Sequence, residues 1–394
     1  MSAEARNPYT PGPGIFPPYL AGRESATRIL DRARDAVEAE GAAAPLVVSG
    51  MRGMGKTVLL LSFRDHLRAA GWLCPGIGEF DSSHRGLAAV WADLAEELGR
   101  ISPHRLPKPR RRRWGVDEVD FKATAGVGLA GPQLSAEAGS VLRRGSRRAD
   151  AQEELRRQML ELARWLEHKH MRAALLFDEA QDASLQDLGL LAEIGHEASK
   201  ERRPLVIVFA GLTPLHDKLV RARTYASRFT PVEVDALSEA EAGAALEIPA
   251  TEAGVSWERK ALGAALDFAR GVPYHLQMIG LQAWERRAGD RIAEGAVEAA
   301  VGVARADIEK SMYRPLWNKA SDGEQEYLLA MALADRGRSG IAVADVLRRL
   351  GKSHADASPL RTRLIRKGLI HPSRHSYLDF SYPGFDRFVA AQKR

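Results

Sequence analysis

A short segment of the chain places three glycines, a lysine and a threonine at a fixed spacing. It fits Gly-x-x-x-x-Gly-Lys-[Ser/Thr] and consists of Gly50, Met51, Arg52, Gly53, Met54, Gly55, Lys56 and Thr57, followed by Val58. Glycines let the backbone turn its N–H groups toward phosphate oxygens, the lysine adds positive charge near the β- and γ-phosphates, and the hydroxyl is a ligand for Mg²⁺. The segment is therefore predicted to be a P-loop that binds ATP with Mg²⁺.

An acidic pair and a hydroxyl follow two apolar runs further along the chain. Asp178 and Glu179 come directly after residues 173–177, and Thr213 comes after residues 204–211. Asp178 is predicted to hold Mg²⁺, directly or through water, and Glu179 to polarise the attacking water. The alternative for this pair is a solvated strand end. Thr213 is predicted either to lie between the acidic pair and the γ-phosphate or to cap the next helix.

Alternating apolar runs and amphipathic segments predict the elements that position these residues. Strands are expected at residues 45–49, 77–81, 173–177 and 204–210. Helices are expected at residues 23–38, 58–69, 87–98 and 151–168. Strands and helices that alternate in this way imply a parallel sheet with right-handed crossovers. The fold class is therefore predicted to be α/β, a P-loop NTPase sheet at residues 19–234.

Two segments depart from this pattern. Residues 1–18 are rich in proline and glycine and are predicted to be an extended lead-in rather than part of a core. An insertion is expected at about 99–150, where the alternation in residues 121–139 predicts a β-hairpin. Its basic run 110–113 is open to three interpretations: a phosphate-backbone patch, a disordered loop or an oligomer contact. Trp114 follows this run and could stack on a base.

The second half of the chain is predicted to be helical, beginning with residues 235–312. Ser238 with Glu241 forms a capping box, and Ser256 is expected to cap a helix that ends at Gly271. A second capping box, Ser321 with Glu324, opens the last unit, residues 313–394.

The last unit is predicted to end in a helix with clear start and stop signals, followed by a hairpin. Ser358 as N-cap, Pro359 in the first turn and Gly368 just past the end define this third helix of the unit. Residues 370–380 are predicted to form the hairpin. Three helices followed by a hairpin are typical of a winged helix.

The order of these motifs resembles an AAA+ ATPase of the origin-recognition initiator type. Besides the P-loop, the resemblance rests on the sequences Leu-Ala-Gly-Arg-Glu at 20–24 and Asp-Glu-Ala-Gln at 178–181. It implies a helical lid at residues 235–312 and a C-terminal winged helix. It also implies contacts with adenine from Tyr19, Gly22 and Arg23. Arg228 is similar to the arginine finger that such proteins present to a neighbouring subunit; the alternative is a surface salt bridge.

The lid departs from the AAA+ pattern. Initiator lids offer an arginine to the γ-phosphate, but none follows Arg270 here. The sequence Gly-Val-Pro at 271–273 instead resembles the STAND class of signalling ATPases, in which the lid proline and its neighbours sense the nucleotide. Pro273 is therefore a predicted nucleotide contact. His275 either substitutes as a phosphate contact or is structural.

The predicted third helix and hairpin of the last unit are strongly basic. Residues 359–374 contain no acid and five basic residues, Arg361, Arg363, Arg366, Lys367 and Arg374. A winged helix places its third helix in the major groove, where arginines contact phosphates or pair with guanine. These five residues are predicted to bind duplex DNA; the alternative is a solvated face or a protein contact.

The bulk composition sets the remaining limits. The 394 residues carry a formal charge of +6 and one cysteine, which excludes an internal disulfide. Neither a secretory leader nor an apolar run long enough for a bilayer is evident, so no membrane partner and a cytoplasmic location are expected. The main hypothesis is a slowly hydrolysing ATPase switch that controls DNA binding, and a homo-oligomer in which Arg228 completes the neighbouring site is one form that it can take. The alternatives are a STAND-like signalling ATPase with an autoinhibitory winged helix and a DNA-target-selecting ATPase of a mobile element.

Overall fold

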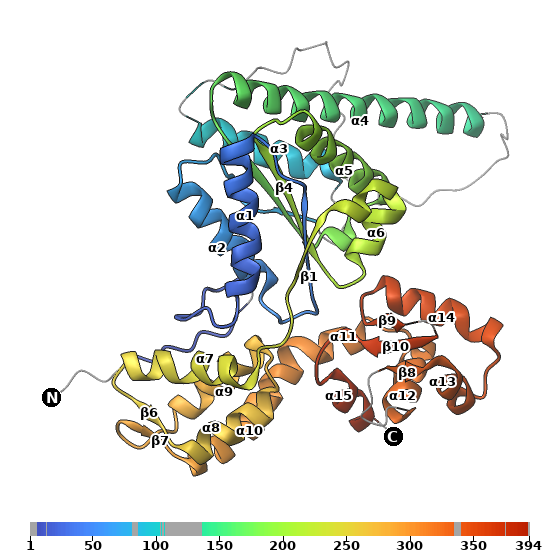
Figure 1. Ribbon diagram of the computed structural model, residues 1–394. Coiled ribbons are helices and arrows are strands. Elements are labelled where there is room, and N and C mark those ends of the chain that lie inside the picture. Colours follow the sequence, from blue (N-terminus) through green and yellow to red (C-terminus); the bar gives the residue numbers. More distant parts are fainter. Residues whose placement is uncertain are drawn as a thin grey trace.

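The computed structural model describes residues 6–12, 14–80, 86–102, 104, 106, 136–334, 340–374 and 376–392, with the helical backbone alone for 136–150. A sheet covered by helices lies above two smaller groups of elements, residues 239–308 and 322–391, which sit side by side (Figure 1). Among the described residues, no helix is both long and apolar enough to cross a membrane.

Five parallel strands form the central sheet in the order β2-β3-β4-β1-β5. They are β1 (Leu46–Ser49), β2 (Gly78–Glu79), β3 (Ala173–Asp178), β4 (Leu205–Gly211) and β5 (Thr230–Glu233). Every residue of β3 and β4 is buried, as expected for strands of a parallel sheet that is covered on both faces. The predicted α/β class with a parallel sheet is confirmed.

Helices cover the two faces of the sheet because successive strand residues point in opposite directions. Leu176 and Val208 pack with α1 (Glu24–Glu40) and α2 (Lys56–Ala69). Phe177 and Phe209 pack on the other face. That face is covered by α3 (Leu87–Ile101), α4 (Ala136–His168), α5 (Leu185–Lys200) and α6 (Leu215–Ala222). Two 3-10 turns, η1 (Ala180–Asp182) and η2 (Thr224–Arg228), complete this part.

The helical group that follows the sheet consists of four helices and a small two-stranded sheet. Its elements are α7 (Glu239–Glu252), β6 (Ser256–Trp257), α8 (Arg259–Ala269), α9 (Pro273–Trp284), β7 (Arg291–Ile292) and α10 (Glu294–Ile308). The capping box of Ser238 and Glu241 is confirmed. The predicted cap at Ser256 is wrong, because its N–H bonds to Asp290 and holds it in β6, while Glu258 precedes α8.

The last group combines helices with a three-stranded antiparallel sheet of order β8-β10-β9. It contains η3 (Glu309–Tyr313, a π-helical turn), α11 (Arg314–Asn318), α12 (Asp322–Ala334), β8 (Ile341–Ala342), α13 (Val343–Leu350), α14 (His354–Arg366), β9 (Ile370–Arg374), β10 (Tyr377–Phe380) and α15 (Phe385–Ala391). The predicted hairpin is confirmed. The predicted cap at Ser358 is wrong: the Ser353 hydroxyl accepts from the Asp356 N–H and starts α14 one turn earlier.

The N-terminal lead-in is extended, but the expectation that it stays outside the core is wrong for Tyr9. This ring is 1% exposed and packs between Trp257 and Trp284 of the helical group. Its hydroxyl donates to the Leu246 carbonyl and accepts from the Trp257 ring. A buried hydroxyl with both hydrogen bonds made is well tolerated in a core, so Tyr9 ties the lead-in to the helices.

The region of the predicted insertion is described only at its ends. Helix α4 begins at Ala136, earlier than expected, and therefore includes the last residues of the segment predicted as a hairpin. The remainder of that predicted hairpin, the basic run 110–113 and Trp114 lie outside the described residues.

Candidate functional site

The glycine-rich segment joins β1 to α2 at the carboxyl edge of the sheet. Gly53 and Gly55 adopt φ values of 80° and 86°, in the left-handed region that favours glycine. Gly50 lies so close to the residue that follows β5 that a Cβ atom would be 2.2 Å from the Val234 carbonyl oxygen. Because α2 begins at Lys56, its free N–H groups face the loop, an arrangement that suits phosphate.

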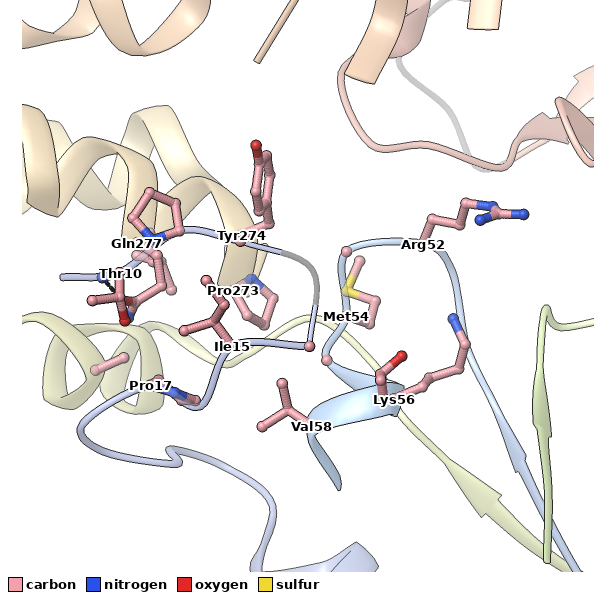
Figure 2. A pocket seen from close by; sticks show the side chains of 18 of the residues that line it. Thr10, Ile15, Pro17, Arg52, Met54, Lys56, Val58, Pro273, Tyr274 and Gln277 are labelled. Carbon is pink, nitrogen blue, oxygen red and sulfur yellow. Dashed lines mark hydrogen bonds between the residues drawn. The ribbon is translucent and has the colours of Figure 1, made fainter. Parts of the chain in front are cut away.

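A pocket of about 520 Å³ opens beside this loop, a size that suits a nucleotide-sized ligand. The predicted site residues that line it are Tyr19, Arg23, Arg52, Gly53, Met54, Gly55, Lys56, Thr57, Val58, Glu179 and Pro273. Figure 2 shows Met54 and Val58 facing Ile15 and Pro273 across the pocket, whereas the Lys56 side chain extends toward Arg52. The wall therefore combines the P-loop, the N-terminal lead-in and helix α9.

Lys56 is a buried cation of the pocket. Its side chain is 7% exposed, and its ammonium group donates to the carbonyls of Gly50 at 3.0 Å and Met51 at 2.9 Å. Burial lowers the pKa of Lys56 to about 8, although the carboxylates of Glu179 and Asp178 oppose the shift. An anionic phosphate in the pocket would supply the negative counter-charge that stabilises this desolvated ammonium group.

Asp178 and Thr57 face each other at the end of β3. The Thr57 hydroxyl donates to Asp178 Oδ2 at 2.6 Å, and the Glu179 N–H donates to Asp178 Oδ1 at 2.8 Å. Burial raises the pKa of Asp178, against the effect of the Thr57 hydrogen bond. One carboxylate beside one hydroxyl fits Mg²⁺, which takes few protein ligands and fills its octahedron with water and phosphate oxygens. Within the described ranges, no group of three or more His, Cys, Asp or Glu side chains is arranged so that it could hold a metal ion.

Glu179 lines the pocket with both carboxylate oxygens engaged. Arg52 Nη1 donates to one oxygen at 3.0 Å, and Gln181 Nε2 donates to the other at 2.5 Å. The side-chain oxygen Oε1 of Gln181 in turn accepts from the Leu212 N–H at 2.9 Å, which fixes the side-chain amide against the end of β4. Glu179 adopts φ 48°, a left-handed conformation that costs a non-glycine residue roughly 1–2 kcal/mol. In this conformation Glu179 lines the pocket while Arg52 and Gln181 hold its carboxylate.

Of the three residues that were expected to contact adenine, Arg23 bonds to the P-loop. Arg23 is 7% exposed and donates to the Met54 carbonyl at 2.7 Å and to the Asp235 carbonyl at 3.2 Å. Tyr19 is half-buried and lines the pocket, whereas Gly22 is not among its lining residues. The guanidinium of Arg23 therefore links the loop to the chain segment that leads into the helical group.

Thr213, Arg228 and His275 are likewise not brought to the pocket. Thr213 is exposed, does not line it, and makes no cap, because α6 starts after Pro214 without a side-chain cap. Arg228 is exposed at the end of η2 and forms no ion pair with any described residue. His275 Nε2 lies 3.2 Å from the Tyr313 hydroxyl, and burial lowers its pKa to about 4. The structure thus favours the structural interpretation of His275.

The basic residues of the last unit divide into two sets. Arg363 and Lys367 bind the carboxylate of Glu324, which is 1% exposed, at 3.1 Å and 2.5 Å. They therefore face α12, contrary to the expectation that the basic side chains point outward. Arg361 is half-buried, and Arg366 is exposed. The exposed Arg374 lies over the Tyr377 ring at 3.9 Å.

Two parts of the pocket wall were missed by the sequence analysis. Thr10 and Ile15 of the lead-in line it, and so does Tyr382, which comes from the loop between β10 and α15. Arg52 lies over the Tyr382 ring at 5.7 Å. No spacing rule links residues so far apart in the chain, so only the tertiary packing reveals these contacts.

Comparison with known proteins agrees with the P-loop and the sheet. Residues 19–208 match the model of the AAA ATPase domain, and residues 310–389 match a domain of unknown function, DUF8462. A search of curated proteins gives no match.

Several solved structures share the fold over nearly the whole chain. The Aeropyrum pernix ORC2 protein in its ADPNP–ADP complexes has a TM-score of 0.58 and 15% identity, covering 95% of this chain and 94% of that chain. The Walker-type ATPase of Pyrococcus abyssi has a TM-score of 0.55 and 17% identity, covering 94% and 96%. Cdc6p from Pyrobaculum aerophilum has a TM-score of 0.50 and 16% identity, covering 96% and 95%. Residues 19–208 therefore match an AAA ATPase domain, and the chain has a fold like that of ORC2 and Cdc6p.

Proposed function

We propose that this protein is an ATP-binding switch that hydrolyses ATP slowly and controls the binding of duplex DNA. The observation that carries the proposal is the composition of the pocket wall. The P-loop, the α9 residues Pro273 and Tyr274, and Tyr382 of the last unit all line one pocket. A nucleotide held there would contact three parts of the chain, so its binding would favour one arrangement of them.

The roles of the pocket residues follow from their positions. Lys56 and the N–H groups at the start of α2 would hold the phosphates, while Thr57 and Asp178 would hold Mg²⁺. The metal would neutralise phosphate charge. Glu179, which faces the pocket, would accept the proton of the attacking water, giving ADP and phosphate.

We assign three units to the switch: an α/β ATPase unit at 19–234, a lid at 235–312 and a winged helix at 313–394. The last assignment is supported by three helices, α12, α13 and α14, followed by the β9–β10 hairpin. Contact with DNA is assigned mainly to Arg361, Arg366 and Arg374, because Arg363 and Lys367 are engaged by the buried Glu324. The exposed Arg228 would complete the site of a neighbouring copy.

The test is a duplex-DNA gel shift with and without ATP across a range of salt. We expect ATP to change the affinity for DNA. Each DNA phosphate that the protein neutralises should add about 0.9 to the slope of log affinity against log salt concentration. Arg366→Ala should weaken DNA binding about tenfold. Arg348→Ala is the matched control, because Arg348 is an exposed arginine on the neighbouring helix α13. Lys56→Ala should abolish the effect of ATP. No shift at low salt would rule out control of DNA binding.

A signalling ATPase held closed by its last unit is the second candidate, favoured by two contacts. Arg52 of the P-loop lies over Tyr382. Gly368 sits so close to the end of β4 that a Cβ atom there would be 3.0 Å from Leu212 Cδ1. In this case ATP would release the last unit, but the protein would not retard DNA in the gel with or without ATP. The same experiment therefore distinguishes the two candidates.

A further inference from the structure

Arg52 occupies an unusual place for a P-loop side chain. Its guanidinium turns toward the acidic end of β3, and Nη1 bonds to Glu179 Oε1 at 3.0 Å. Its Nε is buried and has no hydrogen-bond partner among the described residues. Buried donors are normally paired, so a contact other than a hydrogen bond must help to hold this guanidinium in place.

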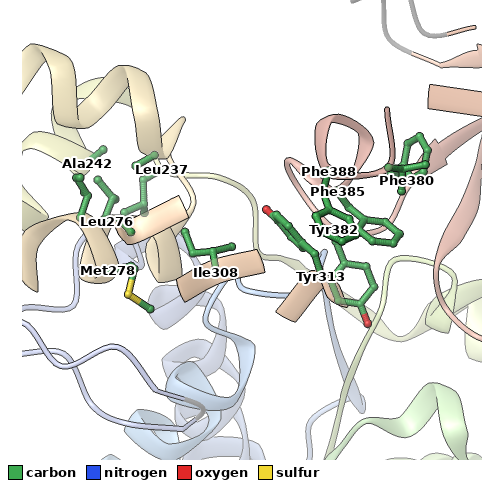
Figure 3. Close-up of a cluster of buried hydrophobic side chains, with 14 of the residues drawn as sticks. Leu237, Ala242, Leu276, Met278, Ile308, Tyr313, Phe380, Tyr382, Phe385 and Phe388 are labelled. Carbon is green, nitrogen blue, oxygen red and sulfur yellow. The ribbon is translucent and has the colours of Figure 1, made fainter. Parts of the chain in front are cut away.

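The other contact of this guanidinium is aromatic. Tyr382 is 4% exposed, and its ring lies 5.7 Å from the Arg52 guanidinium carbon. Figure 3 shows Tyr382 beside Phe385 and Phe388, with Tyr313 next to them. The rings of Tyr382 and Phe385 are 6.1 Å apart, and those of Phe385 and Tyr313 are 5.7 Å apart. Arg52 is therefore attached to the aromatic cluster of the last unit, Tyr313, Tyr382, Phe385 and Phe388.

Glu179 is restrained through the same contact. Arg52 and Gln181 occupy its two oxygens. To act as a base, the carboxylate must turn an oxygen toward the water that attacks the γ-phosphorus. As long as Arg52 stays between Glu179 and Tyr382, the carboxylate is held toward the guanidinium instead.

We propose that Arg52 is a positioning residue that couples docking of the last unit to restraint of Glu179, so that ATP hydrolysis requires Tyr382 to move away. This inference rests on the proposed ATPase function. Hydrolysis joins the water oxygen to the γ-phosphorus, breaks the bond from that phosphorus to the bridging oxygen of ADP, and passes a water proton to Glu179. Undocking frees the guanidinium and, with it, the carboxylate that receives this proton.

Hydrogen exchange of the full-length, nucleotide-free protein tests the coupling without any turnover. Glu179→Gln and Arg52→Gln should each raise the exchange of amides in residues 381–391 about 5- to 30-fold, the range that a desolvated cation–aromatic contact can supply. The double variant should exchange no faster than Arg52→Gln alone. The matched control is Glu97→Gln, which breaks the Arg68–Glu97 ion pair, also 3.0 Å long, and should leave this segment unchanged.

Turnover provides the second measurement. Tyr382→Ala should raise the rate at saturating ATP several-fold, whatever loss of ATP affinity the removal of this pocket residue causes, whereas Tyr382→Phe keeps the ring and should raise the rate less. Unchanged exchange in Glu179→Gln, an additive double variant, or a slower Tyr382→Ala would overturn the role of Arg52. If the unaltered protein fails to bind ATP, the proposed function falls and the control of hydrolysis falls with it. If the protein binds ATP but the variants show no coupling, only the proposed role of Arg52 is overturned.

Discussion

The Thr57 hydroxyl donates to Asp178 Oδ2 at 2.6 Å, although 121 positions separate the two residues in the chain. Thr57 is in the first turn of α2, and Asp178 ends β3. The parallel sheet brings them together because the P-loop follows β1 and both strands end at the same edge. A hydroxyl and a carboxylate this close can share a cation when phosphate oxygens complete its shell.

Loss of the Thr57 hydroxyl should weaken ATP binding only when Mg²⁺ is present. Thr57→Val keeps the shape of the side chain but removes one metal ligand, so the affinity for ATP with Mg²⁺ should fall about tenfold, while the affinity in EDTA should not change. Calorimetric titration with and without Mg²⁺ measures both. Thr213→Val is the matched control, because Thr213 is exposed and does not line the pocket. An equal loss in both conditions would assign Thr57 to the phosphates instead.

Lys56 should make the nucleotide-free protein more stable as the pH rises. Its pKa is lowered to about 8 in the folded state, chiefly by burial, and is near 10.5 when it is unperturbed. Between these values the unfolded chain binds more protons than the folded chain, so the free energy of unfolding increases with pH, by about 1.4 kcal/mol per unit of pKa shift at most. The penalty is complete below about pH 8 and disappears above about pH 10.5.

Urea unfolding of Lys56→Met at pH 7 and pH 9.5 isolates this effect. Methionine fills the same space without a charge, so the variant should exceed the unaltered protein in stability at pH 7, and the difference should shrink at pH 9.5. A difference that is constant with pH would mean that the ammonium group is not the titrating group.

The elements around the P-loop could be predicted because their signals are local. The glycine pattern, the apolar runs of β3 and β4, and the Ser238 capping box each depend on neighbouring residues only. The prediction of a helix cap was wrong where two serines lie near the start of the same helix. Ser353 and Ser358 both precede good helix positions, and the acidic partner Asp356 decides for Ser353.

Contacts between distant segments could not be predicted in this way. Tyr9 fills a space between Trp257 and Trp284 that exists only after the helices have packed, and a Cβ atom on Gly280 would lie 2.6 Å from its ring. Tyr382 reaches the P-loop for the same reason. Neither the lead-in nor Tyr382 belongs to a periodic sequence pattern. The sequence analysis therefore identified the phosphate end of the pocket but missed the walls around it.

His275 should affect stability at low pH and leave ATP binding unchanged. Burial lowers its pKa to about 4, from an ordinary value near 6.5, although a hydrogen bond with the backbone of Ala269 opposes the shift. Between these values the unfolded chain binds the proton and the folded chain does not, so stability falls as the pH drops from about 6.5 to 4. In His275→Gln this dependence should be smaller, as calorimetric melting at pH 5 and pH 7 would show. Weakened ATP binding would instead restore the role of phosphate contact.

Glu324 should stabilise the last unit more than its neighbour Glu326 does. The Glu324 carboxylate is 1% exposed and binds Arg363 and Lys367 on α14, whereas Glu326 is largely exposed and binds Lys352. Glu324→Gln removes the charge from a buried group whose two basic partners are partly exposed, so the free energy of unfolding should fall by roughly 1–2 kcal/mol, against less than about 1 kcal/mol for Glu326→Gln. Urea unfolding of both variants measures the difference. Equal effects would mean that the two basic side chains remain free to bind phosphate, and DNA affinity should then fall in Arg363→Ala as much as in Arg366→Ala.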